Sequence, residues 1–384
     1  MSSISLAPAI DAAQLVLRCT DLGASIEFLT GRLGFKVRLI MPSEAPSVAV
    51  LRAHGCTLRL ETATDGPAGP ARLRLLCKPA LLPAGTPAQL LGPDGLVVDL
   101  VDAHAPVAIP PEVQEFVLTR LGGPESWGVG RAGMLYRDLI PSRLNGRFVA
   151  SHILLPAGGP VPDYVHYHRV RFQVIFCKAG WVRLVYEDQG EPFILNAGDC
   201  VLQPPEIRHR VLESSAGAEV VELGCPAIHE THGDPEMALP TGGCLPQRLY
   251  QAQKFVRHVA AAASWGPSRL PGFEARDTGI AWATEGLGGV RVLRPAAVPT
   301  MAAPDAAVLG TPGAHGGEFL FFFVLAGRCE LGSQALGQHV LSAGDSCVLP
   351  AGADYRFSAT PGLELLEVSL PARPPAAGRQ RPRT

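Results

Sequence analysis

Three histidines in the middle of the chain have the residue types and spacing of a metal site. His166 and His168 lie two residues apart, and side chains at positions i and i+2 of a strand point to the same face of a sheet. His209 follows a Gly-Asp turn and a proline, which allow the chain to return toward the first two. Imidazole nitrogens suit divalent transition metals. We therefore expect the three rings to converge on one ion inside a β-barrel.

The composition indicates a turn-rich β protein of two or three domains. The 384 residues exceed the size of a single hydrophobic core. Hydrophobic residues make up 47% of the chain and charged residues 18%, with 42 Gly and 36 Pro, unlike a helical bundle. The net charge is −2 without a basic stripe, so nucleic acid is not an expected partner.

Membrane insertion and secretion are not expected from the sequence. Apolar runs such as 319–326 are too short to cross a bilayer. The N-terminus lacks the basic and apolar regions of a secretory signal. The nine cysteines are scattered without a CxxC pair, which favours reduced thiols and a cytoplasmic location.

Two composition shifts divide the chain. The N-terminal part follows a β-α-β pattern, with a helix expected over 23–33 that starts after Asp21 and ends at Gly34. A second, short helix is expected over 112–121. Short strands separated by turn residues then occur twice, as in sandwiches and barrels. The expected segments are an abbreviated α+β domain (1–105), a linker with the helix (106–132), a first barrel (133–240), a connector (241–279), a second barrel (280–371) and a disordered tail (372–384).

The two β regions are related by an internal duplication. Lys178–Leu184 resembles Leu325–Leu331, and Ala197–Pro204 resembles Ala343–Pro350 with the same internal spacing. One long repeat that occurs twice predicts two tandem barrels rather than a solenoid.

Positions 159–209 resemble the cupin superfamily, whose first motif is Gly, His-x-His, Glu and Gly and whose second is Gly-Asp, Pro and His. Tandem copies imply a bicupin of two jelly-roll barrels. The N-terminal domain resembles the vicinal-oxygen-chelate fold of glyoxalases and extradiol dioxygenases. That second resemblance is carried by Val16-Leu17-Arg18, by 29–35 and by the Gly-Pro-Asp-Gly turn at 92–95.

The cupin resemblance implies His166, His168 and His209 as metal ligands and departs from the family at one position. Gln173 stands where the family has a glutamate, and we expect it to face the metal, bound directly or through water. A neutral amide leaves the full dipositive charge on the ion, which favours an anionic, chelating substrate. Arg208 either points outward on its strand or reaches that substrate at the rim, so Gln173 and Arg208 are the candidate catalytic residues.

The other two domains are not expected to hold a metal. In the second barrel the repeat places Gly313 and His315 at the His-x-His positions, Leu320 at the glutamate position and Tyr355 at the last histidine. In the N-terminal domain the resemblance places one ligand at an arginine, Arg72, which cannot ligate. The run 229–232, with two further histidines, is expected to be a solvated loop or a lid at the barrel mouth.

The sequence therefore predicts a metal-dependent enzyme. The favoured interpretation is a non-haem Fe(II) dioxygenase that acts on a small aromatic or enolisable carbonyl compound. Mn, Ni and Zn are alternative metals. An O₂-independent isomerase or lyase and a non-enzymatic ligand-binding protein stay open. A homodimer is a possible assembly.

Overall fold

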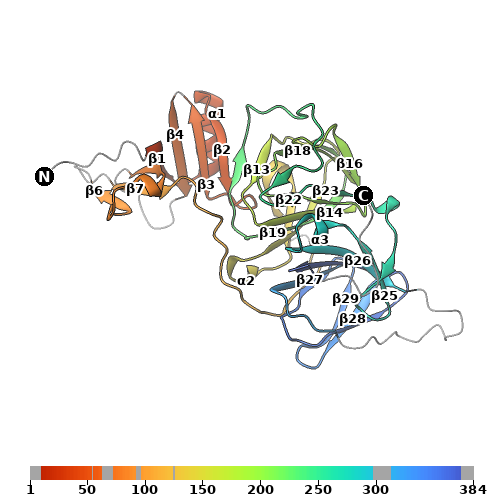
Figure 1. Cartoon of the computed structure of the whole chain (residues 1–384). Coiled ribbons are helices and arrows are strands. Elements are labelled where there is room, and N and C mark those ends of the chain that lie inside the picture. The colour runs from red at the N-terminus through yellow and green to blue at the C-terminus, as the bar shows by residue number, and fades with distance from the viewer. Residues whose placement is uncertain are drawn as a thin grey trace, which may run out of the picture. The chain divides into compact units, whose positions relative to one another are not determined.

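Strands make up nearly all the regular structure of the protein (Figure 1). The helices are short: α1 (Leu22–Leu33), α2 (Arg143–Gly146) and α3 (Ile280–Ala283). The expected mainly β class is thereby confirmed. The expected turn at 92–95 and the tail beyond 372 lie outside the residues that the computed structural model describes, which are 10–53, 55–62, 72–91, 97–123, 126–296 and 313–372.

Contacts group the chain into two units. One holds residues up to 108 together with 164–169 and 229–238, and the other holds the remainder.

The first unit is a sheet with one helix. Its strands lie in the order β13-β20-β2-β3-β4-β1-β5-β7-β6. Asp21 Oδ1 accepts the N–H of Ala24 at 2.8 Å at the start of α1, and Gly34 ends the helix with φ 70°. The expected helix is confirmed. The strands are β1 (Ile10–Cys19), β2 (Lys36–Met41), β3 (Val48–Ala53), β4 (Cys56–Thr62), β5 (Arg72–Cys77), β6 (Gln89–Leu91), β7 (Val97–Asp102), β13 (His166–His168) and β20 (Thr231–Gly233).

The second unit contains two antiparallel barrels, and the first is built from two sheets. One sheet has the order β23-β17-β14-β19-β11-β10-β9, and the other contains β16-β15-β18 with β12 beside β18. The strands are β9 (Gly128–Val129), β10 (Leu135–Asp138), β11 (Val149–Leu155), β12 (Gly159–Pro160), β14 (Phe172–Ala179), β15 (Trp181–Tyr186), β16 (Phe193–Asn196), β17 (Cys200–Leu202), β18 (His209–Ser214), β19 (Ala218–Cys225) and β23 (Val256–His258).

The second barrel repeats this arrangement. Its sheets have the orders β24-β25-β26-β32-β27-β30-β8 and β29-β28-β31, and a separate hairpin pairs β21 (Leu249–Tyr250) with β22 (Gln253–Lys254). The strands are β8 (Val117–Thr119), β24 (Gly266–Pro267), β25 (Phe273–Asp277), β26 (Gly289–Pro295), β27 (Phe319–Ala326), β28 (Arg328–Ser333), β29 (Gly337–Ser342), β30 (Ser346–Val348), β31 (Arg356–Ala359) and β32 (Glu364–Leu370).

Three apolar clusters hold this second unit together. One cluster fills each barrel. The largest cluster lies between the two seven-stranded sheets, and we call this cluster the shared wall. In the shared wall Phe148 stacks on Phe319 with ring centroids 4.0 Å apart. Along β14, Phe172 contributes to the shared wall while Cys177 lies inside the first barrel. Because side chains alternate along a strand, Gln173 shares the inner face with Cys177.

The expected helix over 112–121 is wrong, because this segment is extended and contains β8. Leu118 and Val117 pair with Cys347 and Val348 of β30, and Asp345 Oδ1 accepts the N–H of Leu121 at 2.8 Å. Leu118 packs on the core of the second barrel and Val117 on the shared wall. Pairing and burial on both faces outweigh the helical pattern of the sequence.

The internal duplication is visible in the hydrogen bonds of both barrels. Asp199 and Asp345 each accept a main-chain N–H through a side-chain oxygen at 2.9 Å, from Asn196 and Ser342 respectively. The glycines before them have positive φ, 88° at Gly198 and 93° at Gly344. The two turns are therefore built in the same way, as the repeat predicts.

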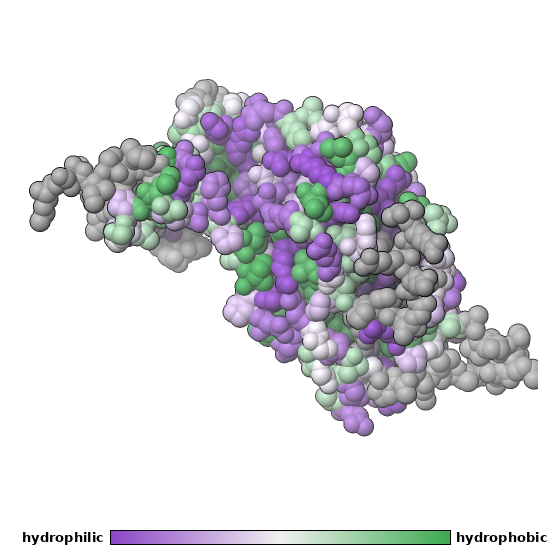
Figure 2. All heavy atoms as spheres, viewed as in Figure 1, coloured by the Kyte–Doolittle hydropathy of each residue, from purple (hydrophilic) through white to green (hydrophobic). Residues whose placement is uncertain are grey.

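The described surface that is visible in Figure 2 has no large apolar area, and the cysteines form no disulfide bond. On the face that Figure 2 shows, hydrophobic residues lie in small groups between hydrophilic ones. All nine cysteines are free. No helix in the described part of the chain is long and apolar enough to span a membrane.

Candidate metal centre

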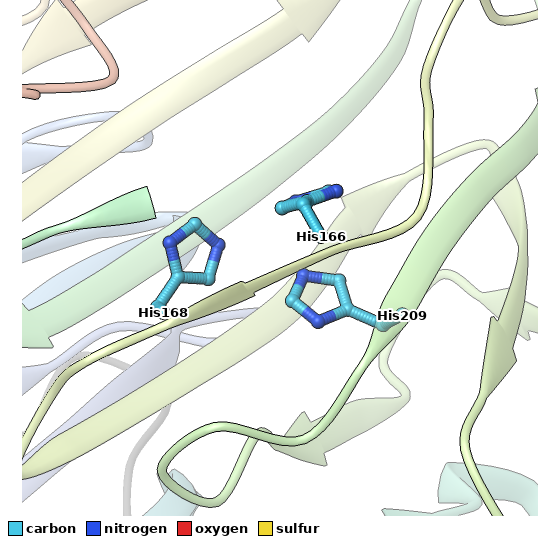
Figure 3. A group of neighbouring side chains, drawn as sticks. All are labelled: His166, His168 and His209. Carbon is cyan, nitrogen blue, oxygen red and sulfur yellow. The ribbon is translucent and has the colours of Figure 1, made fainter. Parts of the chain in front are cut away.

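His166, His168 and His209 lie together, as the sequence predicts. One nitrogen of each ring lies within 4.8 Å of the others, and all three side chains are buried. His166 and His168 come from β13 and His209 from β18 (Figure 3). Among the described residues, no other group of three His, Cys, Asp or Glu side chains is close enough to hold an ion.

The rings of His166 and His168 are oriented by oxygen atoms. The Nδ1 of His166 donates to the carbonyl of Tyr164 at 2.7 Å. The Nδ1 of His168 lies 2.9 Å from Thr231 Oγ1, which can accept a hydrogen bond from it. When Nδ1 carries the proton, Nε2 keeps its lone pair for a metal.

His209 has the same tautomer. Its Nδ1 donates to the carbonyl of Ile207 at 3.0 Å. Burial lowers the pKa of His209 to about 4, so the ring is neutral at neutral pH. Its Nε2 therefore has a free electron pair, which accepts a hydrogen bond from Nε2 of Gln203 at 2.8 Å.

The residues around His209 fit a metal or a bound polar group. Tyr186, which is 1% exposed, stacks on His209 with centroids 5.5 Å apart. Within the described part of the chain, the Tyr186 hydroxyl and Gln203 Oε1 are buried without a hydrogen-bond partner. Buried polar atoms are rarely left unpaired. Three imidazoles beside two such atoms suit a divalent transition metal.

Gln173 lies on the inner face of β14 and has a carboxylate partner. It is 1% exposed, and its Nε2 donates to Glu222 Oε1 at 2.5 Å. Ile175, on the same face as Gln173, pairs with Glu222 of β19. The amide nitrogen is thereby held, and Oε1 is the atom that Gln173 has left to offer an ion.

Arg208 is half-buried at the start of the segment that carries His209. Its guanidinium donates to the carbonyl of Glu206 at 3.2 Å, and its main-chain N–H donates to Glu187 at 3.3 Å. These bonds hold the start of β18. A role of Arg208 in binding substrate stays a prediction.

The expectation of a solvated loop at 229–232 is wrong, and the alternative of a lid stays a prediction. Thr231–Gly233 forms β20, in which Thr231 pairs with His168 and His232 with Tyr167. Thr231 is 1% exposed. The segment reads as polar in sequence because its side chains bind the ring of His168 and the carboxylate of Glu230 rather than water.

The second barrel uses its equivalent residues for structure, as expected. His315 Nε2 donates to the carbonyl of Leu349 at 2.8 Å, and Gly313 forms a β-bridge with Tyr355. Tyr355 and Leu320 belong to the apolar core of this barrel.

Four residues near the histidines were missed at the level of sequence: Gln203, Tyr186, Thr231 and Glu222. Glu222 offered a signal, because it is one of only two carboxylates in an otherwise apolar strand. Gln203 offered another, because it ends an apolar strand one residue before the motif proline. Thr231 and Tyr186 offered none, since their roles depend on strand pairing.

Comparisons with known proteins give distant likenesses only. No family model and no curated protein matches the chain. The structure is similar to a mutant of Bacillus subtilis oxalate decarboxylase, at 11% identity and TM-score 0.48, over 71% of this chain and 81% of that one. It is similar to the E. coli protein Ylba, at 12% identity and TM-score 0.43, over 68% and 94%. A mutant of salicylate 1,2-dioxygenase from Pseudoaminobacter salicylatoxidans matches at 15% identity and TM-score 0.41, over 58% and 70%. The reaction must therefore be inferred from the residues of this chain.

Proposed function

We propose that this chain is a metal-dependent oxygenase with a non-haem Fe(II) centre at His166, His168 and His209. The observation that carries the proposal is the common orientation of the rings. Each Nδ1 is next to an oxygen of the chain, and one nitrogen of each ring lies within 4.8 Å of the others. Three neutral donors leave the charge of a divalent ion uncompensated, so the substrate is an anion that chelates through two oxygens.

An Fe(II) ion held there supplies Lewis acidity and open positions for the substrate and O₂. The chain supplies a dry, shaped site. Burial raises the pKa of Tyr186 well above its ordinary value, so the hydroxyl stays protonated and can donate to an anionic oxygen. Gln173, held by Glu222, faces the same interior. Arg208 is proposed to bind the substrate anion at the rim.

The first test is metal content. Purified protein is expected to hold one divalent ion per chain, by elemental analysis after reconstitution with Fe(II). His166→Ala and His209→Ala are expected to lose the ion. His315→Ala removes the equivalent imidazole of the second barrel and is expected to keep it. Wild-type protein without metal, or unchanged retention in the first two variants, contradicts the proposal.

The second test separates oxygenase from other chemistry. The Fe(II)-loaded protein is expected to consume O₂ with a diketone or a hydroxybenzoate, as followed with an oxygen electrode. Product formed without O₂ indicates an isomerase or lyase instead. Binding without any product indicates a ligand-binding protein.

A further inference from the structure

A second buried glutamine, Gln203, contacts His209 directly. It follows β17, is 1% exposed, and its main-chain N–H donates to the carbonyl of Gln173 at 3.0 Å. Its side-chain Nε2 lies 2.8 Å from His209 Nε2. Because His209 Nδ1 donates to the Ile207 carbonyl, His209 Nε2 must be the acceptor. The amide of Gln203 thus uses the same lone pair that a metal would use.

The oxygen of this amide lacks a hydrogen-bond donor among the described residues. Within the described residues, Gln203 Oε1 is buried and has no hydrogen-bond partner. A buried acceptor without a donor costs free energy, which a bound cation would recover. Turning the amide about its last bond exchanges the positions of oxygen and nitrogen and brings Oε1 to the side of His209.

The second barrel shows what these positions require where the described residues form no group of metal-binding side chains. Leu349 donates its main-chain N–H to the carbonyl of Leu320 at 2.9 Å, as Gln203 does to Gln173. Leu349 and Leu320 both lie in the apolar core of that barrel. The first barrel, which contributes His209, has amides at both positions, and the second barrel has leucines. The fold itself therefore does not require an amide at either position.

We propose that Gln203 is a metal-facing residue of the His166–His168–His209 centre. It occupies the lone pair of His209 through Nε2 in the metal-free chain and presents Oε1 to the ion when metal binds. This inference rests on the proposed metal centre. It adds a neutral oxygen ligand before substrate binds, so the protein supplies three imidazoles and an amide to an ion that accepts oxygen ligands, such as Fe(II) or Mn(II). A chelating substrate and O₂ together need three of six positions and therefore displace this amide.

The test uses the full chain loaded with Mn(II), whose bound waters are counted by water-proton relaxation. Gln203→Leu installs the residue of the second barrel. It is expected to raise the dissociation constant for Mn(II) at least tenfold and to gain one metal-bound water. Gln253→Leu is the control, because Gln253 is another buried glutamine, 5% exposed, whose amide donates to the Arg171 carbonyl. It is expected to change neither quantity.

The outcomes separate the two proposals. A wild-type chain that binds no Mn(II) overturns the metal centre and this inference with it. Wild-type binding with an unchanged water count in Gln203→Leu overturns this inference alone, because a residue that only orients His209 would alter affinity without freeing a coordination position. If Gln203→Leu does not fold, Gln203→Glu decides. A carboxylate there is expected to tighten Mn(II) binding without adding a water, and weaker or equal binding overturns the inference.

Discussion

The three imidazoles depend on different kinds of acceptor. His166 and His209 bind main-chain carbonyls, which no substitution removes, whereas His168 binds the hydroxyl of Thr231. The partner of a ligating histidine fixes its tautomer and ring orientation. Thr231 is therefore the one acceptor of the three that a side-chain substitution can test.

We expect Thr231→Val to weaken metal binding by about 10- to 100-fold, the usual effect of losing such a partner. Valine has the shape of threonine without the acceptor, so β20 keeps its pairing. Competition with a chelator measures the dissociation constant. Thr231→Ser keeps a hydroxyl and is expected to stay near wild type, and equal affinity in both variants would refute the role.

At this scale the sequence identified the three histidines that lie together but not their environment. His166, His168 and His209 stand out because a strand period and a turn motif bring them together. Thr231 lies on β20, and no local feature of the sequence predicts that this strand pairs with β13. Glu222 and Gln203 can be placed in the interior only when the register of β14 is known. Long-range register is what the local pattern cannot supply.

Among the elements, the turn before β30 leaves no space for a side chain at Gly344. Gly344 has φ 93°, and a Cβ built there would lie 2.9 Å from Leu121 Cδ2. Gly352 has φ 80° with nothing within 4 Å of the same point. Both glycines use a conformation that costs an alanine about 1–2 kcal/mol.

We therefore expect Gly344→Ala to lower the free energy of unfolding by more than Gly352→Ala does. Only the first variant adds a clash, with the segment that follows β8. Denaturant unfolding of both variants measures the difference. An equal decrease in the free energy of unfolding in both variants would show that the Leu121 side chain moves aside without an energetic cost.

Strands β11, β14 and β19 each contribute one residue to a polar cluster around Glu219. Glu219 accepts a hydrogen bond from His152 at 2.7 Å and another from Lys178 at 2.6 Å, and these bonds lower the pKa of Glu219 to about 2. In the unfolded chain this carboxyl titrates near 4.5. Between these values the unfolded state binds more protons, so the stabilisation is complete above pH 4.5 and is lost as the pH falls toward 2.

The stability difference between wild type and Glu219→Gln is accordingly expected to be constant near neutral pH and to shrink below pH 4.5. Denaturant unfolding at a series of pH values measures it. Glu213→Gln is the control, since Glu213 lies 3.7 Å from Arg183 at an exposed position and such pairs contribute little. A difference that does not change with pH would contradict the assignment.

For the whole second unit, the shared wall packs the two barrels against each other within one compact unit. Phe319, Phe321 and Phe323 of β27 face the wall, while the residues between them face the second barrel. In sequence this strand is a continuous apolar run, which indicates burial on both faces but not what lies on each. The duplication was therefore predictable, and the packing of one copy on the other was not.

We expect Phe319→Ala to cost about 3–5 kcal/mol, because it removes a fully buried ring stacked on Phe148. Because the wall belongs to both barrels, both are expected to unfold in one transition. Calorimetry should report the same midpoint as the fluorescence of Trp181, which lies in the first barrel, in a variant whose three other tryptophans are replaced by phenylalanine. Separate midpoints would show that the barrels are independent.

The pairing of β8 with β30 has a consequence for synthesis of the chain. Leu121 and its partner Asp345 are 224 residues apart, and the whole first barrel lies between them. At about 5–20 residues per second, a ribosome needs about 10 to 45 seconds to bridge that interval. During that time β8 has emerged without the strand that will cover its edge, and an uncovered edge is where chains aggregate. The nascent protein is thus most vulnerable after the first barrel has been made and before the last strands appear.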